Sequence, residues 1–168
     1  MSKSKNTTTP SPVNEDQYNA FIRDLQICKL TFPSVSWKLI ELPPKDMKLR
    51  DEVALEINEP LISEDHTEVT IPATLTVWAK GEGKEEPFME ISMHQHLTIT
   101  INPEHFSEEI LQAYIVRNAV LNLVSVFREH VKYATFQMGL PPLILPAFKI
   151  TPPGKENESQ EGADTDAP

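Results

Sequence analysis

The chain of 168 residues has one cysteine, Cys28, and only five glycines. A single thiol cannot close an internal disulfide, and no cysteine pair is available to hold a structural zinc ion. The three glycines of the central region, Gly81, Gly83 and Gly139, are too few and too scattered to form a loop that cradles a nucleotide phosphate. The chain also lacks the Gly-x-Ser-x-Gly motif of hydrolases. These absences argue against an enzyme and fit a reducing, cytoplasmic compartment.

Long hydrophobic runs and excess positive charge are also missing. No run approaches the roughly 20 apolar residues that a membrane span needs, and the first 14 residues lack the apolar stretch of a signal peptide. Fifteen Lys and Arg residues stand against 25 Asp and Glu residues, a formal net charge of −10. That charge repels the phosphate backbone of a nucleic acid. We therefore expect neither nucleic-acid binding nor membrane insertion.

Both ends of the chain are too polar to bury an apolar face. Residues 1–17 are rich in Thr, Lys, Asn and Pro, and residues 153–168 carry five acidic residues and one lysine. Such segments do not bury enough apolar surface to offset the entropy lost on ordering. We expect a disordered N-terminal tail, one folded domain over residues 18–152, and a disordered acidic tail over residues 153–168.

Alternation of apolar and polar residues predicts an antiparallel sheet. Residues 53–57, 68–79 and 88–101 each place their apolar side chains on one parity, the pattern of a strand with one buried face. The segment from Gly81 to Glu85 breaks the alternation with two glycines, which predicts a hairpin between the last two strands. Earlier, the parity changes within residues 21–32, and we interpret this as a strand with a bulge.

A long helix is predicted after the sheet. Ser107 is a good helix cap, acidic residues follow it, and apolar residues recur with helical spacing as far as Met138. At about 1.5 Å per residue such a helix spans roughly 45 Å, which is longer than a small sheet needs. We therefore expect part of its apolar surface to contact another subunit. Gly139 and the prolines after it end the helix.

The segment from Leu140 to Phe148 is almost wholly apolar but too rich in proline for a helix or a central strand. Two interpretations stay open: a segment that lines a binding groove, or a strap that closes the core over the helix. Methionines 89, 93 and 138 belong to the flexible, polarizable side chains that promiscuous binding surfaces use, although core packing explains each one alone.

Two groups of residues suggest chemistry weakly. His94 and His96 share one face of a strand and could bind a metal with a third ligand from Glu90, His66 or His105, or they could be solvated. Cys28 lies in an apolar strand pattern, where a cysteine usually acts as a small hydrophobe. Neither group predicts a catalytic site or a cofactor.

Four stretches of the chain carry a resemblance to the SecB family of protein-export chaperones and its wider SecB-like superfamily. Val126-Phe127-Arg128-Glu129-His130-Val131 resembles the family's aromatic-Ala-Arg-Glu-x-Ile stretch, and residues 138–148 resemble its Gly-x-(Phe)-Pro-x-Leu-x-Leu-x-Pro connecting loop. Residues 51–57 resemble its Pro-Glu-Val-Lys-Leu-Asp-Leu strand, and residues 88–91 its Leu-Cys-Glu-Val strand start. The resemblance covers about residues 20–150.

The resemblance implies an α+β fold, with a four-stranded antiparallel sheet packed against one long C-terminal helix, and assembly as a dimer or a dimer of dimers. It further implies an ATP-independent holdase that binds unfolded polypeptides and delivers them to SecA for export. The client-binding residues that we predict on this basis combine one strand start with the proline-rich segment: Phe88, Met89, Met93, Leu140, Leu143, Ile144, Leu145 and Phe148.

Three departures from the family keep other roles open. The second helix of SecB has no counterpart after Phe148, the segment from Ser36 to Arg50 has no convincing match, and Lys29 and Pro33 stand where SecB carries acidic residues that face SecA. Glu90 alone keeps a matching carboxylate for that partner. The alternatives are a chaperone dedicated to one client, such as an antitoxin, and an oligomeric adaptor without chaperone activity.

Overall fold

The computed structural model describes residues 13–43 and 49–145. The described part therefore excludes most of both predicted tails and the end of the proline-rich segment, including Phe148. Its elements follow one another in this order: α1 (Glu15–Asp24), β1 (Gln26–Leu39), β2 (Leu49–Ile57), β3 (Leu61–Ile62), β4 (Glu68–Gly81), β5 (Pro87–Thr100), η1 (Pro103–His105), α2 (Glu108–Tyr114), η2 (Ile115–Ala119) and α3 (Val120–Gln137).

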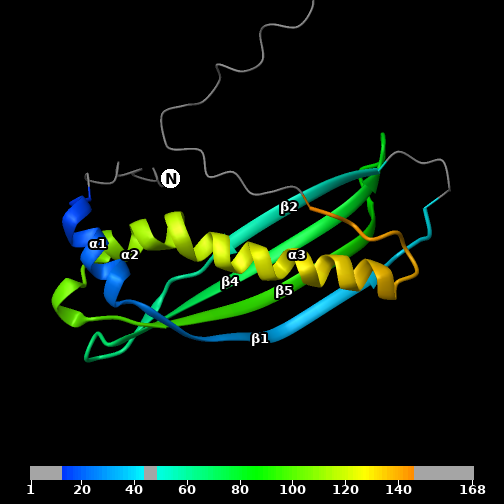
Figure 1. Ribbon diagram of the computed structural model, residues 1–168. Helices are drawn as coiled ribbons and strands as arrows, with labels where there is room; N and C mark the ends of the chain where they lie inside the picture. Colours follow the sequence, from blue (N-terminus) through cyan, green and yellow to red (C-terminus); the bar gives the residue numbers. More distant parts are fainter. Residues whose placement is uncertain (1–12, 44–48, 146–168) are drawn as a thin grey trace, which may run out of the picture.

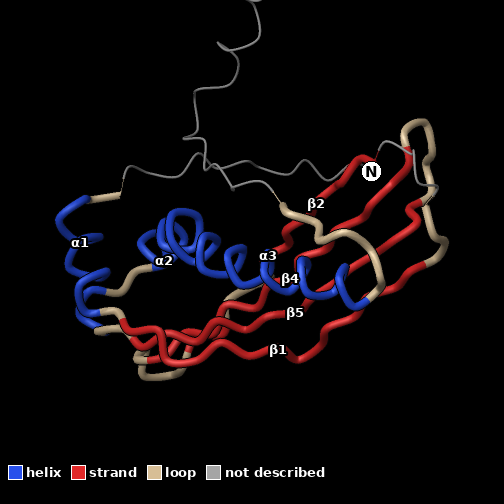
Figure 2. The backbone as a smooth tube through the Cα atoms, turned by 45° about the vertical axis from the view of Figure 1, so that its right-hand side comes forward, coloured by secondary structure: helices blue, strands red, loops and turns tan. Residues whose placement is uncertain are grey.

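The strands form one antiparallel sheet in the order β1-β5-β4-β2, with the short β3 paired to β4. The long helix crosses one face of this sheet, which we call the inner face; the opposite face is the outer face (Figures 1 and 2). The predicted α+β fold, with an antiparallel sheet against a long C-terminal helix, is confirmed. The sheet has five strands rather than four because Leu61 and Ile62 pair with β4.

The hairpin of β4 and β5 forms the centre of the sheet. Odd-numbered residues of both strands face inward and are buried, whereas most even-numbered residues are partly exposed on the outer face. The parity predicted for these strands is therefore confirmed. Threonines and serines line the outer face in cross-strand pairs, such as Thr70 with Thr98 at 3.1 Å and Thr76 with Ser92 at 3.2 Å.

Strand β1 is irregular at two places. Its register against β5 shifts between Ile27 and Lys29 and again between Thr31 and Ser34. The predicted bulge is thus present, but the predicted start at Phe21 is wrong, because residues 15–24 form helix α1. Asn14 caps this helix by accepting hydrogen bonds from two backbone N–H groups, and Phe21 is buried as part of a helical face rather than of a strand.

The main helix runs continuously through α2, η2 and α3, over Glu108–Gln137. Ser107 caps it by accepting a hydrogen bond from the N–H of Ile110, as its sequence predicts. Its central segment η2 is π-helical, the one part of the rod that departs from α-helical winding. The rod is long and apolar enough to cross a membrane by composition, but half of its most apolar window is buried inside the protein, as in the core helix of many globular folds.

Helix α1 packs on the part of the main helix that contains η2. The ring of Phe21 meets the ring of Tyr114 edge to face, with centroids 5.9 Å apart. Tyr18 donates a hydrogen bond to Oδ1 of Asn118 at 2.6 Å, and the guanidinium of Arg117 lies 4.9 Å from the centre of the Tyr18 ring. Residues at the end of α2 and in the π-helical segment therefore hold α1 in place together.

The buried tyrosine of this contact should make stability sensitive to alkali. Burial raises the pKa of Tyr114 to about 12 from its ordinary 10.0. The unfolded chain therefore loses this proton first, so the free energy of unfolding should be undiminished below pH 10 and should fall as pH rises toward 12. Denaturant titrations across that interval should show a shallower fall for Tyr114→Phe. Tyr133→Phe, which removes an exposed hydroxyl, is the control and should keep the wild-type slope.

Candidate functional site

The C-terminal end of α3 determines where the proline-rich segment goes. Gly139 adopts a left-handed backbone with φ of 75°, which glycine allows without strain. The N–H of Gly139 donates to the carbonyl of Phe136, and the N–H of Leu140 donates to the carbonyl of Thr135, the two hydrogen bonds of a Schellman cap. The chain therefore reverses direction at Gly139 and runs back over the sheet toward β2 (Figure 1).

Thr135 attaches the returning segment to the helix. Its side chain is buried, and its hydroxyl donates to the carbonyl of Val131 at 3.0 Å while it accepts the N–H of Leu143 at 3.0 Å. Leu145 is then buried against the core, and Ile144 beside it is 75% exposed. We call residues 140–145 the strap. Both interpretations of this segment describe part of it, because one side chain closes the core and the next faces outward.

The predicted client-binding residues do not lie together on one surface. Met89 and Met93 are buried on the inner face beneath the helix, and Phe88 is also buried. Leu140 and Leu143 are half-buried against the core. Of the described members, only Ile144 is widely exposed, and Phe148 lies outside the described residues.

A different apolar surface is exposed on the inner face of β1. Helix α3 packs against β5 and β4, and β1 lies to one side of it (Figures 1 and 2). Four large side chains on this face of β1 are 37 to 52% exposed. We call them the open strip: Ile27, Phe32, Val35 and Trp37.

The register places these side chains on the inner face. Ile27, Val35 and Trp37 each pair with a buried inner-face residue of β5, and the ring of Phe32 lies 5.1 Å from the ring of His130 on α3. Sequence analysis did not name Val35 or Trp37 as binding residues. The alternation of Val35, Trp37 and Leu39 with small or charged residues was the available signal, but it lies in a segment without a counterpart in the SecB family.

The outer face carries the remaining candidates from the sequence. Glu90 is half-buried there, in register with Lys38 on one side and Trp78 on the other. His94 contacts the hydroxyl of Thr74 at 2.9 Å, and no group of three or more His, Cys, Asp or Glu residues within 13–43 and 49–145 could hold a metal ion. Cys28, which lies in an apolar sequence pattern, is exposed at the first bulge of β1.

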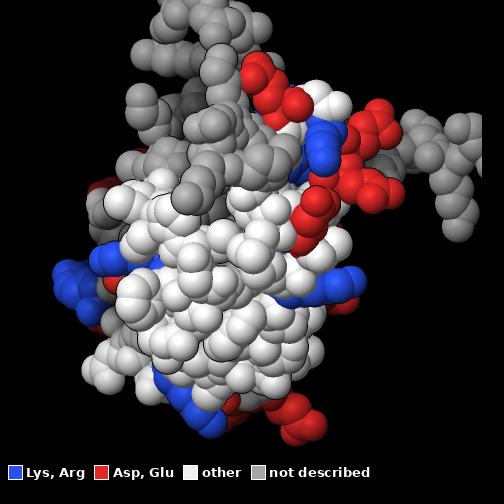
Figure 3. All heavy atoms as spheres, turned by 90° about the vertical axis from the view of Figure 1, so that its right-hand side faces the viewer, with Lys and Arg blue, Asp and Glu red and all other residues white. Residues whose placement is uncertain are grey.

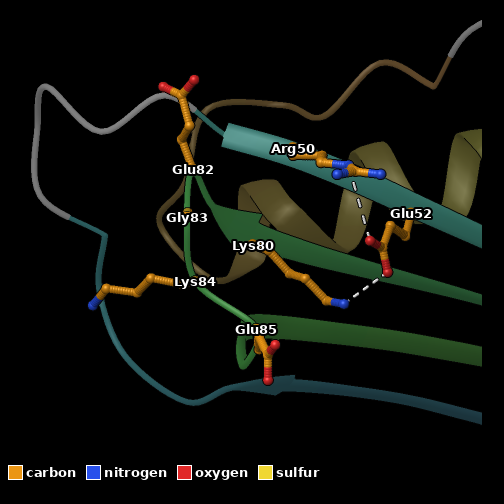
Figure 4. A pocket seen from close by; sticks show the side chains of 8 residues that line it. Arg50, Glu52, Lys80, Glu82, Gly83, Lys84 and Glu85 are labelled. Atoms are coloured by element: carbon orange, nitrogen blue, oxygen red, sulfur yellow. Dashed lines mark hydrogen bonds and ion pairs between the residues drawn. The ribbon is translucent and has the colours of Figure 1, made fainter.

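A depression lies where the β4–β5 turn meets the start of β2 (Figure 4). It has a volume of about 770 Å³ and a charged lining: Arg50, Glu52, Lys80, Glu82, Lys84 and Glu85 together with two glycines. Lys80 donates to Glu52 at 2.7 Å, and this hydrogen bond lowers the pKa of the Glu52 carboxyl. The lining holds three cations and three anions, so the depression has no net charge that would select an ionic ligand.

The end of the molecule next to this depression has an area without charged side chains. Figure 3 shows the end at which α3 stops, and the middle of this face carries no Lys, Arg, Asp or Glu, while several acidic side chains gather near one margin. The exposed apolar residues of the strap and of the last helical turn belong to this end: Tyr133, Phe136 and Ile144.

Comparison with known proteins identifies the fold. No protein-family model matches the chain, and no curated protein matches its sequence. A SecB-like chaperone of Mycobacterium tuberculosis, solved in complex with a peptide from the HigA1 antitoxin, matches at a TM-score of 0.70 and 15% identity, over 80% of this chain and 97% of that chain. A protein of unknown function from Streptococcus agalactiae matches at a TM-score of only 0.37 and 14% identity, over 73% and 96% of the two chains.

The chain therefore has the SecB-like fold. This confirms, at the level of the fold, the resemblance that the motifs in the helix and the proline-rich segment indicate.

The hydroxyl of Thr135 should control the position of the strap. Thr135→Val keeps the shape but removes the acceptor for the N–H of Leu143, and we expect a loss of about 1–2 kcal/mol in the free energy of unfolding. Limited proteolysis within residues 140–145 should also become faster. Thr135→Ser, which keeps the hydroxyl, should remain close to the wild type in proteolysis; equal cleavage of the Val variant and the wild type would show that the hydrogen bond does not hold the strap.

Proposed function

We propose that this protein is a SecB-like chaperone that holds unfolded or extended polypeptide without ATP, in the cytoplasm and without catalytic activity. The observation that carries the proposal is the open strip, four large apolar side chains on a strand that the protein's own helix covers only in part. Contiguous exposed apolar surface usually marks a binding site for another protein. The shared fold with a chaperone solved in complex with a peptide supports the same function.

The open strip suits an extended segment rather than a folded surface. Its side chains follow one strand of 14 residues, so they repeat along a line as the side chains of an extended client do. Capture would remove apolar surface from water on both partners, at about 25 cal/mol for each Å² buried. This driving force is independent of nucleotide hydrolysis and weakly selective for sequence, as a holdase requires.

Of the residues predicted from the sequence, Ile144, Leu140 and Leu143 are the accessible or partly accessible members of the proposed client surface. Met89 and Met93 support the proposed client surface indirectly, because they belong to the core on which β1 and the helix pack. Phe88, Leu145 and Phe148 remain part of the proposed set. We place the centre of the client surface on the open strip and extend it to the strap.

We also propose a homo-oligomer, either a dimer or a tetramer. The side of the main helix that points away from the sheet has four large apolar residues that are 43 to 66% exposed: Val116, Leu121, Tyr133 and Phe136. Within the described residues β1 pairs with β5 only, so its second edge is free to pair with a strand of another chain. Helix and strand contacts of this kind would bury the apolar surface that remains.

The nature of the client divides the proposal into two forms. In the first form the clients are proteins destined for export, and SecA is a partner that contacts Glu90 on the outer face. In the second form the client is a single protein such as an antitoxin, which the peptide bound to the Mycobacterium tuberculosis chaperone favours. An adaptor that binds a folded partner is the alternative to both, and it does not need a strip suited to extended chains.

One pair of neighbouring substitutions tests the proposed client surface. Val35→Asp places a charge on the open strip, whereas Ser36→Asp places the same charge on the outer face of the same strand. Loss of one buried valine contact, about 1.5–2 kcal/mol, should raise the concentration needed to suppress aggregation of a reduced, unfolded model protein by about tenfold for Val35→Asp. Ser36→Asp should suppress as the wild type does.

Light-scattering mass and circular dichroism of each variant show whether it keeps its assembly and fold. A wild-type oligomer that never suppresses aggregation would rule out a general holdase. Equal suppression by both variants would place the client surface elsewhere.

The export form makes a separate prediction for the outer face. If SecA is a partner, Glu90→Lys should weaken its binding by at least about tenfold, because the change replaces an attractive charge with a repulsive one. Calorimetric titration of SecA into the wild type and the variant would measure this. His94→Lys changes the charge on the same face four residues further along β5 and serves as the control. No binding of SecA to the wild type would leave the dedicated-client form.

A further inference from the structure

A glutamine lies in the core of the described residues without a visible hydrogen-bond partner. Gln95 lies on the inner face of β5 and is fully buried, yet neither its amide nitrogen nor its amide oxygen has a hydrogen-bond partner among the residues that the structure describes. An amide in this state costs about 1–3 kcal/mol relative to a paired one. Every other inner-face residue of β5 from Met89 to Thr100 is apolar. Packing alone does not explain a glutamine at this place.

The surroundings of Gln95 are irregular on one side only. In β4 its partner is Ala73, whose small side chain carries no polar group that could pair with the amide. In β1 the residues opposite Gln95 are Phe32 and Pro33, because the register jumps from Thr31 paired with His96 to Ser34 paired with His94. The bulge therefore lies beside the unpaired amide, and Pro33 within it has no N–H to donate.

Phe32 and His130 close the space between β1 and α3 at this level. Their rings are 5.1 Å apart, and Phe32 is 37% exposed. Phe32 is also a member of the open strip, which continues to Ile27 on one side and to Val35 on the other. The exposed strip therefore passes directly beside the bulge that lies opposite the buried amide.

We propose that the Gln95 amide is a polar anchor for the main chain of the bound polypeptide, reached between Phe32 and His130. This inference rests on the proposed function and assigns it a specificity-determining residue. A primary amide offers one donor and one acceptor side by side, which complements the carbonyl and N–H groups of an extended main chain. The open strip would bind apolar side chains of the client, and Gln95 would fix the position of the segment along the strip.

Main-chain recognition explains why the polar group is buried. A hydrogen bond formed out of water is stronger than one on the surface, and an unpaired group in the free protein makes its formation on binding more favourable. An apolar residue at this position would hold a client by side-chain contact only, and the client could slide. Gln95 would therefore select extended segments over helical ones, because a helix pairs its own N–H and carbonyl groups.

Gln95→Met tests the inference, since methionine keeps the length of the side chain and removes the amide. The probe is a fluorescently labelled peptide of alternating valine and lysine that matches the 14 residues of β1. We expect the melting temperature of the variant to be equal to or above that of the wild type, and the dissociation constant of the peptide to rise by about tenfold. Gln112→Met, on the exposed surface of α2, is the matched control and should change neither value.

A series of peptides locates the hydrogen bond directly. In each member, one amide N–H is replaced by an ester oxygen, which removes a single main-chain donor. At least one position should weaken binding to the wild type by about tenfold and have no effect on binding to Gln95→Met. This comparison reports main-chain contact, which a merely structural role of Gln95 would not affect.

The outcomes separate this inference from the proposed function. If the wild type binds neither the peptide nor an unfolded protein, both are wrong. If the wild type binds the peptide but Gln95→Met binds it equally well, the anchor is wrong and the holdase stands; the amide then pairs with an internal water molecule. Insensitivity of the wild type to every ester substitution overturns the anchor even if the methionine variant fails to fold.

Discussion

The packing of one helix on two central strands is the contact on which the rest of the structure depends. Helix α3 covers the inner faces of β5 and β4, whose odd-numbered residues form the main core with Leu123, Phe127 and Val131 of the helix. A helix is about 10 Å wide and strands are about 4.8 Å apart, so one helix covers about two strands. The two outer strands must therefore be covered by something else or remain exposed.

The two outer strands meet this constraint differently. On the side of β2, the strap returns from Gly139 and buries Leu145 (Figure 1). On the side of β1, the structure supplies no comparable cover within the described residues, and the open strip remains in contact with solvent. The difference between the two sides of the sheet thus comes from Gly139 and the hydroxyl of Thr135 at the end of α3. They direct the strap toward β2, and no other described segment returns over the sheet on the side of β1.

Sequence reasoning predicted the centre of this molecule better than its edges. The strands β4 and β5 have a strict period of two, and the helix begins at a good cap, so local pattern and tertiary packing agree there. Helix α1 was missed because its two buried residues, Tyr18 and Phe21, are too few to show a period. The buried methionines were predicted as surface residues because composition does not reveal which strands the helix covers.

Gln95 interrupts the apolar alternation of β5 and shows the limit of prediction from one strand. The apolar residues of β5 share one parity, and Gln95 is the polar exception between Met89 and Ile99. Its burial follows from parity alone. Its position beside the bulge at Phe32 and Pro33 follows only from the register of β1 against β5. A site that depends on how two strands pair cannot be predicted from the sequence pattern of either strand alone.

The π-helical segment η2 has a consequence for how the main helix can change in sequence. A π-helical turn holds one more residue than an α-helical turn, so it rotates everything before it by about 100° relative to everything after it. The buried sides of α2 and α3 therefore point in different directions along the same main helix. The buried side of α2 faces α1, and that of α3 faces the sheet. Each of the two helical segments can therefore accept substitutions that suit its own packing partner. A single-residue deletion within residues 115–119 would remove the rotation between the segments and turn the residues that now hold α1 toward solvent.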